Sequence, residues 1–356
     1  MELYIGIDDH SSTCSYAVMD AQGRLLQEST VETSLEALRG VLSVLRGRRY
    51  VAVENGTRAE WLYHGLRGYC EDLLVANLVG LGKYRRNKSD RLDARELADL
   101  RRLGVLRGIY HHREEDLRAL KQAVRVYEQL SGDVARCKNR IKAVYRSLGI
   151  GCPGEQVYQK SRRQRWLKKL KPAGHRRRAE RLLEELDLLR PLKQASQKEM
   201  IQAARKRKKE YAILRSVEGI GPVRAAQLLG HIGNPARIHN KRALWRMSGL
   251  AVVSRSSSDY TVVNARTGEL APRRRVQTRG LNPDCNRRLK AIFKSAALTA
   301  IQRGHVFKAH YERRVEQGMR EAMARLTIAR KLSAAAWACW KKGEPFNPDR
   351  LRTFPG

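Results

Sequence analysis

The N-terminal stretch MELYIGIDDH (residues 1–10) decides the fold of the first third of the chain. Leu3–Asp8 is apolar until it ends on a carboxylate, which is typical of a buried strand. Similar short runs predict further strands at Ser15–Met19, Leu25–Thr30, Tyr50–Glu54 and Leu73–Ala76. Periodic apolar residues predict helices at Ser34–Arg46, Ala59–Arg67 and Ser89–Leu103. Three strands followed by alternating helix and strand predict an α/β layer with a central sheet over residues 1–107.

Four carboxylates stand at the ends of these elements. Asp8 ends the first strand, Glu54 ends a later strand, and Asp90 and Asp93 share one face at the start of the following helix. The helix pair also has a purely structural explanation, because acids in a first turn stabilise the helix dipole. Four acids that converge repel one another unless cations lie among them. Oxygen ligands select Mg²⁺ or Mn²⁺, and two such ions about 4 Å apart serve phosphoryl transfer. Strand alternation places Asp9 on the opposite face.

The charge balance predicts a polyanionic partner. The chain holds 72 Lys and Arg against 36 Asp and Glu, a net charge of +36, and a phosphate backbone compensates such an excess directly. An RNA-packing protein or a membrane-surface binder are the alternatives. The second is weak, because no run approaches the ~20 apolar residues of a spanning helix and no signal peptide opens the chain. Aromatic residues are only 6%, which favours backbone electrostatics over base stacking as the main binding mode.

The six cysteines are scattered without a C-x-x-C pair, which predicts neither a zinc site nor a disulfide framework. They fit thiols in a reducing cytoplasm.

Residues 108–210 have an almost wholly helical pattern. Apolar residues recur at alternating steps of three and four from Leu117 to Leu148, as in a long helical hairpin or coiled coil, and Gly149 and Pro153 end this run. A second helical stretch covers 173–209, with a kink expected at Pro191. Basic clusters at 160–171, 176–178 and 205–209 favour a phosphate-binding surface over merely solvated faces.

From residue 211 the helices become shorter. The run from Leu214 to Leu229 has the pattern of a helix-hairpin-helix, with Gly219-Ile220-Gly221 at its turn. Such a turn leaves backbone N–H groups open at a helix N-terminus, where a phosphate binds without sequence readout, and Arg224 nearby favours binding. The alternative is a tight interhelical turn with no ligand.

Three motifs carry a family resemblance. GIDDH, VAVENG and KSDRLDAR resemble the Asp, Glu and Asp-x-x-Asp motifs of the DEDD transposases of insertion sequences, bridge-RNA-guided recombinases related to the Piv DNA invertase. The resemblance implies an RNase H-like (RuvC-type) domain in which Asp8, Glu54, Asp90 and Asp93 hold two Mg²⁺ or Mn²⁺ ions. Lys88 and Arg95 also match the family's usual setting and are expected at the nucleic acid.

The resemblance further implies a serine that attacks DNA phosphate. Counted without gaps from Gly249-Leu250, it falls on Ser257, with Ser256 as a close competitor and Ser258 in place of the family's glycine. From chemistry alone, this serine cluster is an ordinary polar loop. Relative to compact members of the family, the stretch 261–272 resembles an insertion. The resemblance assigns three arginines to the DNA phosphate beside the nucleophile, namely Arg279, Arg287 and Arg288. Trp337 and Trp340 are expected to be packing residues.

Together these features predict an α/β plus all-α protein in three parts: an RNase H-like domain (1–107), a helical or coiled-coil segment (108–210), and a helical transposase domain with a helix-hairpin-helix (211–356). The resemblance implies Mg²⁺-dependent cleavage and exchange of donor and target DNA through a serine–DNA link, a bridge RNA, a homodimer or homotetramer, and a place at the nucleoid of a bacterial or archaeal cytoplasm, with no membrane partner. Two alternatives remain: a RuvC-like structure-specific nuclease that uses water, and a non-catalytic RNA- or DNA-binding protein.

Overall fold

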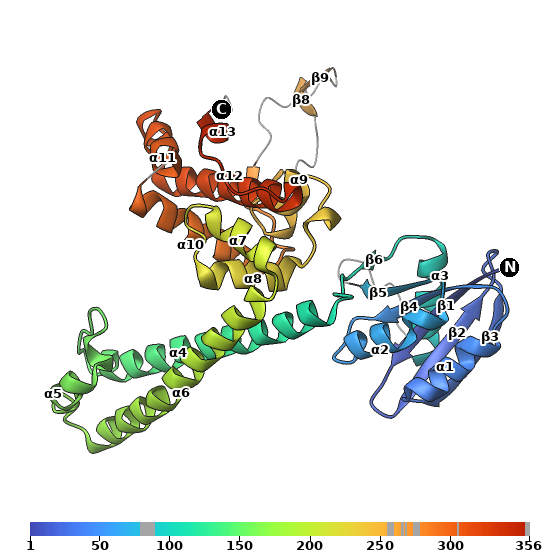
Figure 1. Ribbon diagram of the computed structural model, residues 1–356, viewed down its shortest axis with the longest axis horizontal. Helices are drawn as coiled ribbons and strands as arrows, with labels where there is room; N and C mark the ends of the chain where they lie inside the picture. The colour runs from blue at the N-terminus through green and yellow to red at the C-terminus, as the bar shows by residue number, and fades with distance from the viewer. Residues whose placement is uncertain are drawn as a thin grey trace. The chain divides into compact units, whose positions relative to one another are not determined.

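The computed structural model describes residues 1–78, 90–254, 260–264, 267, 269–272, 278–304 and 306–352, with the backbone alone at 90–92, 254, 260–264, 269–272, 278–279 and 352 (Figure 1). The chain divides into two compact units, Met1–Arg113 and Glu114–Gly356. The predicted boundaries at residues 107 and 210 stay predictions.

The first unit is built on a six-stranded sheet of order β3-β2-β1-β4-β5-β6. Its strands are β1 (Glu2–Asp9), β2 (Thr13–Met19), β3 (Leu25–Glu32), β4 (Arg48–Glu54), β5 (Asp72–Asn77) and β6 (Arg107–Gly108). β1, β4 and β5 run parallel, whereas β2, β3 and β6 are antiparallel to their neighbours. The five predicted strands are confirmed, and the arrangement is consistent with the RNase H-like fold. β6 was not predicted, because two residues are too few to show a strand pattern.

Helices cover both faces of this sheet (Figure 1). α1 (Leu35–Val44) and α2 (Ala59–Leu66) share a core with the face of β1 that carries Ile5 and Ile7. α3 (Asp90–Arg102) covers the other face, where Leu97 packs against Ala52 and Ala76. The three predicted helices are therefore confirmed, and β1 is buried on both sides.

The second unit opens with two long helices that pack together, α4 (Glu115–Arg146) and α6 (Ala173–Arg205). The predicted apolar seam is buried along α4, at Leu117, Leu120, Val124, Val134, Cys137, Ile141 and Val144. The short helix α5 (Arg163–Leu167) lies between α4 and α6 in the chain, and its Trp166 packs on Tyr145. α6 continues through Pro191, which lies inside the helix.

The remaining helices form one core together with the nearest turns of α4 and α6. They are α7 (Lys208–Ser216), α8 (Pro222–Ile232), α9 (Lys241–Met247), α10 (Arg287–Arg303), α11 (Val306–Glu316), α12 (Glu321–Lys342) and α13 (Asp349–Arg352). Two strand pairs interrupt them, β7 (Val252–Ser254) with β10 (Thr278–Leu281) and β8 (Tyr260–Asn264) with β9 (Glu269–Pro272). Among the described residues, no helix combines the length and apolar character that crossing a membrane requires.

Candidate active site

Two of the four predicted acids meet at one edge of the sheet. β1 and β4 are parallel and in register through Gly6–Ala52 and Ile7–Val53, so the next pair in this register is Asp8 with Glu54. Register partners on adjacent strands point to the same face, and the strands lie about 4.8 Å apart. Asp8 is buried, with 5% of its surface exposed, and Glu54 is half-buried. The sheet therefore places two carboxylates side by side at the carboxyl ends of β1 and β4.

The helix that carries the other two acids packs against this face of the sheet. A Cβ added at Gly6 would lie 2.1 Å from the carbonyl oxygen of Ala94 in α3. Gly6 and Asp8 are two residues apart on one strand and share a face. Asp8 therefore points to the side of the sheet that α3 covers.

The direction of α3 follows from its other end. The Arg101 guanidinium lies 5.9 Å from the Tyr50 ring centroid, and Tyr50 is in register with Tyr4, near the start of β1. Because Tyr4 lies level with Arg101 and Gly6 lies level with Ala94, α3 runs antiparallel to β1. The first turn of α3, with Asp90 and Asp93, is consequently its end nearer to Asp8.

The described side chains do not by themselves complete a metal site. No three His, Cys, Asp or Glu side chains among them are grouped closely enough to hold an ion. Asp93 is half-buried, whereas the Asp90 side chain and all of Lys88 lie outside the described residues. The donor chemistry nevertheless fits magnesium, because Mg²⁺ is usually held by one or two carboxylates together with waters and substrate phosphates. Asp8 and Glu54 supply such a pair.

Asp9 is engaged elsewhere. The Arg58 Nε donates to Asp9 Oδ2 at 2.9 Å, and Arg58 Nη2 lies 2.9 Å from Asp9 Oδ1. Arg58 also donates to the backbone carbonyls of His10 and Ser11. This pair ties the β1–β2 loop to the start of α2, and its hydrogen bond to Asp9 raises the pKa of Arg58. Asp9 thus has a structural partner of its own, distinct from the edge that Asp8 shares with Glu54.

Sequence reasoning missed His10. Its Nε2 lies 2.9 Å from Asp8 Oδ2, with 45% of the His10 side chain exposed and 7% of the Asp8 side chain. An imidazole beside a buried carboxylate satisfies one of its oxygens and compensates its charge when protonated. The signal was present in GIDDH, in which the histidine follows Asp8 by two residues.

Arg95 faces the sheet. Its Nε and Nη2 both donate to the Glu28 carboxylate of β3 at 2.5 Å. A bidentate pair of this kind fixes the helix against the sheet edge. The predicted contact of Arg95 with nucleic acid stays a prediction.

The predicted nucleophile falls in the segment 255–277 between β7 and β10, here called the serine loop. Ser256 and Ser257 fall in 255–259, outside the described residues, but the strands on either side of the loop pair through Ser254–Thr278 and Val252–Leu281. Two asparagines fix the base of this loop: Asn282 N–H donates to Ala251 O at 3.0 Å, and Asn286 N–H donates to Met247 O at 2.8 Å. The sequence alone assigned neither asparagine a role.

The three arginines that follow the loop differ in their surroundings. The Arg279 side chain lies outside the described residues. Arg287 is exposed in the first turn of α10. Arg288 Nε lies 3.5 Å from the Oε2 of Glu128, a buried acid that also binds Gln227 and His231. Arg287 is therefore the best placed of the described pair to meet a phosphate.

The helix-hairpin-helix turn packs on α10. Gly219 has φ +81°, and a Cβ there would lie 2.2 Å from the Ala296 carbonyl oxygen. Arg224 donates from Nη1 to Gly219 O at 2.7 Å and from Nε to Ser295 Oγ at 3.1 Å, and its burial lowers its pKa. Gly219 and Arg224 thus have structural roles at the turn, and their predicted phosphate contact stays a prediction. Gly221 caps α8 ahead of Pro222.

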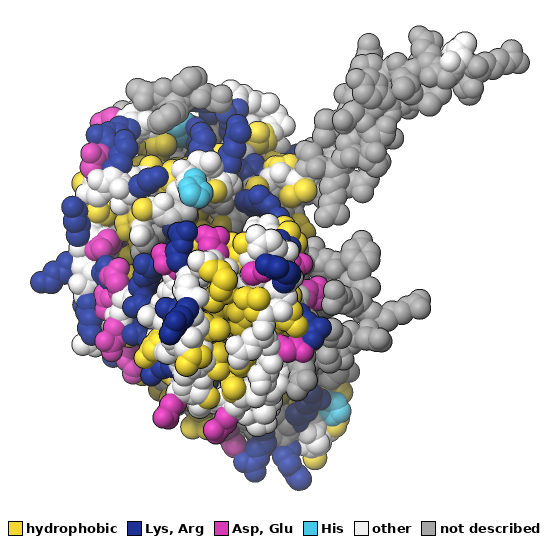
Figure 2. Space-filling view, turned by 90° about the vertical axis from the view of Figure 1, so that its right-hand side faces the viewer, with side chains coloured by type: hydrophobic (Ala, Val, Ile, Leu, Met, Phe, Trp, Pro, Cys, Tyr) yellow, Lys and Arg dark blue, Asp and Glu magenta, His cyan; other side chains and the backbone are white. Residues whose placement is uncertain are grey.

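The basic clusters are mostly exposed. Lys160, Arg162, Arg165, Lys168, Lys169 and Lys171 are all on the surface, as are Arg176, Arg177 and Arg178. Arg163 and Arg207 are the half-buried members, and each pairs with acids, Arg163 with Asp187 and Arg207 with Asp116. The face shown in Figure 2 carries many Lys and Arg side chains interspersed with acids. The positive charge of these exposed side chains is therefore accessible to a polyanion.

Comparisons with known proteins match two parts of the chain. Residues 5–149 match a transposase family model, that of the IS110-type DEDD transposases, and residues 211–312 match the model described as transposase IS116/IS110/IS902 family. A 44.8 kDa uncharacterized protein of insertion element IS116 from Streptomyces clavuligerus is 28% identical over 136 residues, which cover 38% of this chain and 30% of that protein. The chain thus spans about a third of this relative's length.

All six cysteines, each within the described residues, are free thiols.

Proposed function

On the premise that this chain carries the two transposase domains of the IS110/IS116 family, we propose that it cleaves and rejoins DNA strands through a serine–DNA intermediate. The observation that carries the proposal is the pair Asp8 and Glu54, adjacent at the carboxyl edge of the sheet on the face that α3 covers. In an open sheet with parallel strands, this edge is where ligands bind.

Asp8 and Glu54, with Asp90 and Asp93 from the first turn of α3, would hold divalent cations. When bound, Mg²⁺ or Mn²⁺ neutralises charge on the phosphate under attack. Burial of Asp8 keeps competing water from its carboxylate, and His10 orients it through the 2.9 Å contact. Asp8 and Glu54 thus provide a pair of neighbouring carboxylates before DNA arrives.

The Ser257 hydroxyl would attack the scissile phosphate. The oxygen–phosphorus bond to serine forms as the bond to the leaving strand's oxygen breaks, and that oxygen takes up a proton. The resulting phosphodiester conserves the bond for transfer to a second DNA end. Arg287, at the α10 N-terminus beside the loop base, and Arg279 would hold the phosphate.

Partners follow from the same proposal. A bridge RNA would pair with donor and target DNA, so that base pairing selects the sites and the protein recognises backbone and shape. A homodimer or homotetramer would bring two DNAs together. The net charge of +36 supports both ideas, because it exceeds the roughly 6–10 phosphate contacts of a typical DNA-binding protein.

The test uses the full chain together with the RNA that co-purifies with it. This RNA is sequenced, and the donor and target DNAs are chosen to pair with it. We expect Mg²⁺-dependent strand exchange, lost in Asp8→Asn and in Ser257→Ala, and a phosphoserine–DNA adduct that mass spectrometry maps to Ser257. Asp9→Asn is the matched control, since Asp9 binds Arg58.

Each contrary result is informative. Cleavage that survives both Ser256→Ala and Ser257→Ala but not Asp8→Asn would identify a water-using nuclease. Salt-sensitive binding without cleavage at any metal concentration would leave only a nucleic-acid-binding protein. An adduct on Ser256 would move the nucleophile by one residue and overturn the assignment to Ser257.

A further inference from the structure

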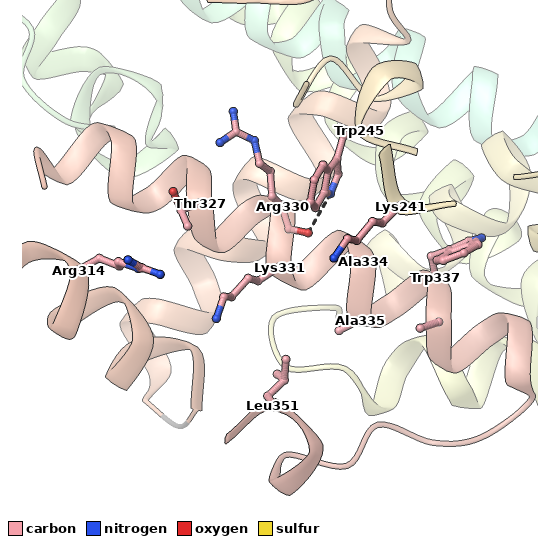
Figure 3. A pocket seen from close by; sticks show the side chains of 11 residues that line it. Lys241, Trp245, Arg314, Thr327, Arg330, Lys331, Ala334, Ala335, Trp337 and Leu351 are labelled. Carbon is pink, nitrogen blue, oxygen red and sulfur yellow. Dashed lines mark hydrogen bonds between the residues drawn. The ribbon is translucent and has the colours of Figure 1, made fainter. Parts of the chain in front are cut away.

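A cavity in the second unit has a strongly positive lining. It measures about 550 Å³ and lies between α9, α11, α12 and α13 (Figure 3). This volume is within the range of about 300–1,000 Å³ typical of pockets that enclose a small ligand. Its charged residues are Lys241, Arg314, Arg330 and Lys331, and none of its eleven lining residues, all within the described part of the chain, is acidic.

The positively charged side chains at one end of the cavity repel one another. Arg314 of α11 and Lys331 of α12 extend toward the same part of the cavity (Figure 3). Burial lowers the pKa of Lys331, and the nearby positive charges of Arg314 and Arg313 lower it further. Burial likewise lowers the pKa of His310, and the charge of Lys331 adds to this effect. A bound anion relieves such repulsion, so this end of the cavity suits a phosphate.

The other walls are apolar and aromatic. Trp245 of α9 lines the cavity with Ala334, Ala335 and Ala338 of α12, and Trp337 is another of its lining residues. Both indoles are fixed: Trp245 Nε1 donates to Arg330 O at 3.1 Å, and Trp337 Nε1 donates to Pro235 O at 3.0 Å. A rigid indole beside small side chains provides a flat wall against which a base can stack.

The cavity shares residues with the base of the serine loop. Arg330 Nε donates to Leu250 O at 2.7 Å, and the Trp245 carbonyl accepts from the N–H groups of Leu250 at 2.7 Å and Ala251 at 3.0 Å. Leu250 and Ala251 lead directly into β7 and the loop that carries Ser257. Whatever occupies the cavity is therefore coupled to the backbone that positions this loop.

We propose that the cavity binds one unpaired nucleotide of the DNA strand that undergoes exchange, with its phosphate at Arg314 and Lys331 and its base against Trp245. The choice of DNA rests on the proposed function, because strand exchange unpairs nucleotides near the serine loop.

The test measures binding of a fluorescent single-stranded DNA 12-mer to the full chain in EDTA, so that no cleavage is required. We expect Arg314→Gln/Lys331→Gln to weaken binding about tenfold and to lower the slope of log affinity against log salt by about 0.7 for each lost phosphate contact. The control Lys308→Gln/Arg325→Gln removes the same charge from the same two helices, at exposed residues paired with Glu312 and Glu321. It should stay within twofold of the wild type.

Three further arms make the result decisive. Duplex DNA of the same sequence should lose no more affinity in the cavity variant than in the control variant. Single-stranded DNA with 5-iododeoxyuridine should cross-link to Trp245 or Trp337 on illumination of the wild-type protein, a readout that needs no variant to fold. Equal affinities for both double variants, or cross-links found only elsewhere, would overturn the proposal. The third arm is an RNA 12-mer of the same sequence: tighter binding than that of the DNA 12-mer, lost in the cavity variant, would overturn the assignment to DNA. None of these outcomes depends on whether Ser257 is the nucleophile.

Discussion

Gly6 of β1 and Ala94 of α3 approach so closely that no side chain fits between them. A Cβ at Gly6 would lie 2.1 Å from Ala94 O, 2.6 Å from Ala98 N and 2.8 Å from Leu97 Cβ. The backbone of the helix therefore rests directly on the strand. This contact sets how near the first turn of α3 comes to the carboxyl end of β1, where Asp8 lies.

Replacing Gly6 should separate the helix from the sheet. We expect Gly6→Ala to lower the free energy of unfolding by about 1–3 kcal/mol or more, because a rigid helix backbone must move to admit the methyl group. Denaturant titration of the wild type and the variant measures the change. Gly40→Ala is the control: Gly40 lies in α1 with no atom within 4 Å of the added Cβ, and alanine should stabilise that helix by about 0.5–1 kcal/mol. Equal effects of the two substitutions would mean that the close contact has no special weight.

Magnesium should stabilise the first unit through Asp8 and Glu54. A ligand that binds the folded state at 100 times its Kd adds about 2.7 kcal/mol to the free energy of unfolding. We expect Mg²⁺ to raise the melting temperature of the wild type, EDTA to reverse the rise, and Asp8→Asn and Glu54→Gln to reduce it strongly. Asp9→Asn should keep the Mg²⁺-dependent increment, although the lost Arg58 pair lowers the starting value. An increment unchanged in Asp8→Asn would place the ion elsewhere.

The sequence predicts the strands of the sheet well, because strand ends and period-two burial are local signals. It also places Asp8 and Glu54 at the ends of two strands, and the structure adds that these strands are parallel neighbours. Contacts between distant residues leave no such trace: the bidentate bond of Arg95 to Glu28 joins residues 67 apart, and the fit of Gly6 under Ala94 depends on packing that periodicity does not encode. The family resemblance favoured Arg95 as a nucleic-acid contact, and the structure shows a partner for it within the fold.

The C-terminal unit was less predictable for a related reason. Its cavity is lined by residues from four helices. Nothing in the sequence indicates that Trp337, expected to be a packing residue, also lines a cavity. Arg224 similarly has the pattern of a phosphate ligand, yet it hydrogen-bonds Gly219 and Ser295. The strands β7 and β10 pair although 23 residues separate them in the chain. Each strand is also too short to show a recognisable alternation of apolar and polar residues.

Glu128 should make stability depend on pH. Burial raises the pKa of Glu128, but the hydrogen bond and charge of His231, with Arg288 and Gln227, together lower it below its usual value. A carboxylate with a lowered pKa in the folded state stabilises above the unfolded pKa of about 4.3, and this contribution is lost as the pH falls through the folded value. We expect Glu128→Gln to be less stable than the wild type at pH 7 by about 1–3 kcal/mol, since His231 and Arg288 lose their anionic partner.

Urea titrations of both proteins between pH 7 and pH 3 provide the measurement. The difference between them should narrow as the wild-type carboxylate is protonated. Glu155→Gln is the control, because Glu155 is 65% exposed in its pair with Lys138 and such a surface pair contributes about 0–1 kcal/mol. A difference at Glu128 that is constant across this pH range would show that its charge does not stabilise the fold.

Gly249 should control the base of the serine loop through two separable effects. It has φ +63°, and an added Cβ would lie 2.4 Å from Cys285 Sγ. Gly149 has φ +71° and no atom within 4 Å of an added Cβ, so Gly149→Ala introduces the backbone strain without a clash. We expect Gly149→Ala to cost about 1–2 kcal/mol of unfolding free energy, and Gly249→Ala to cost more, because Cys285 precedes the α10 cap Asn286 and has little room to move.

The double variant Gly249→Ala/Cys285→Ala separates these contributions. Removing Sγ relieves the closest contact but leaves the positive φ, so the stability of the double variant should recover toward that of Gly149→Ala. DNA cleavage by Gly249→Ala, assayed well below its melting temperature, should fall further than cleavage by Gly149→Ala, since displacement of Gly249 shifts Leu250, Ala251 and the strand that leads to Ser257. If both single variants cleave equally while Gly249→Ala is the less stable, the clash is absorbed within the fold, and the geometry of the loop base does not set the position of the nucleophile.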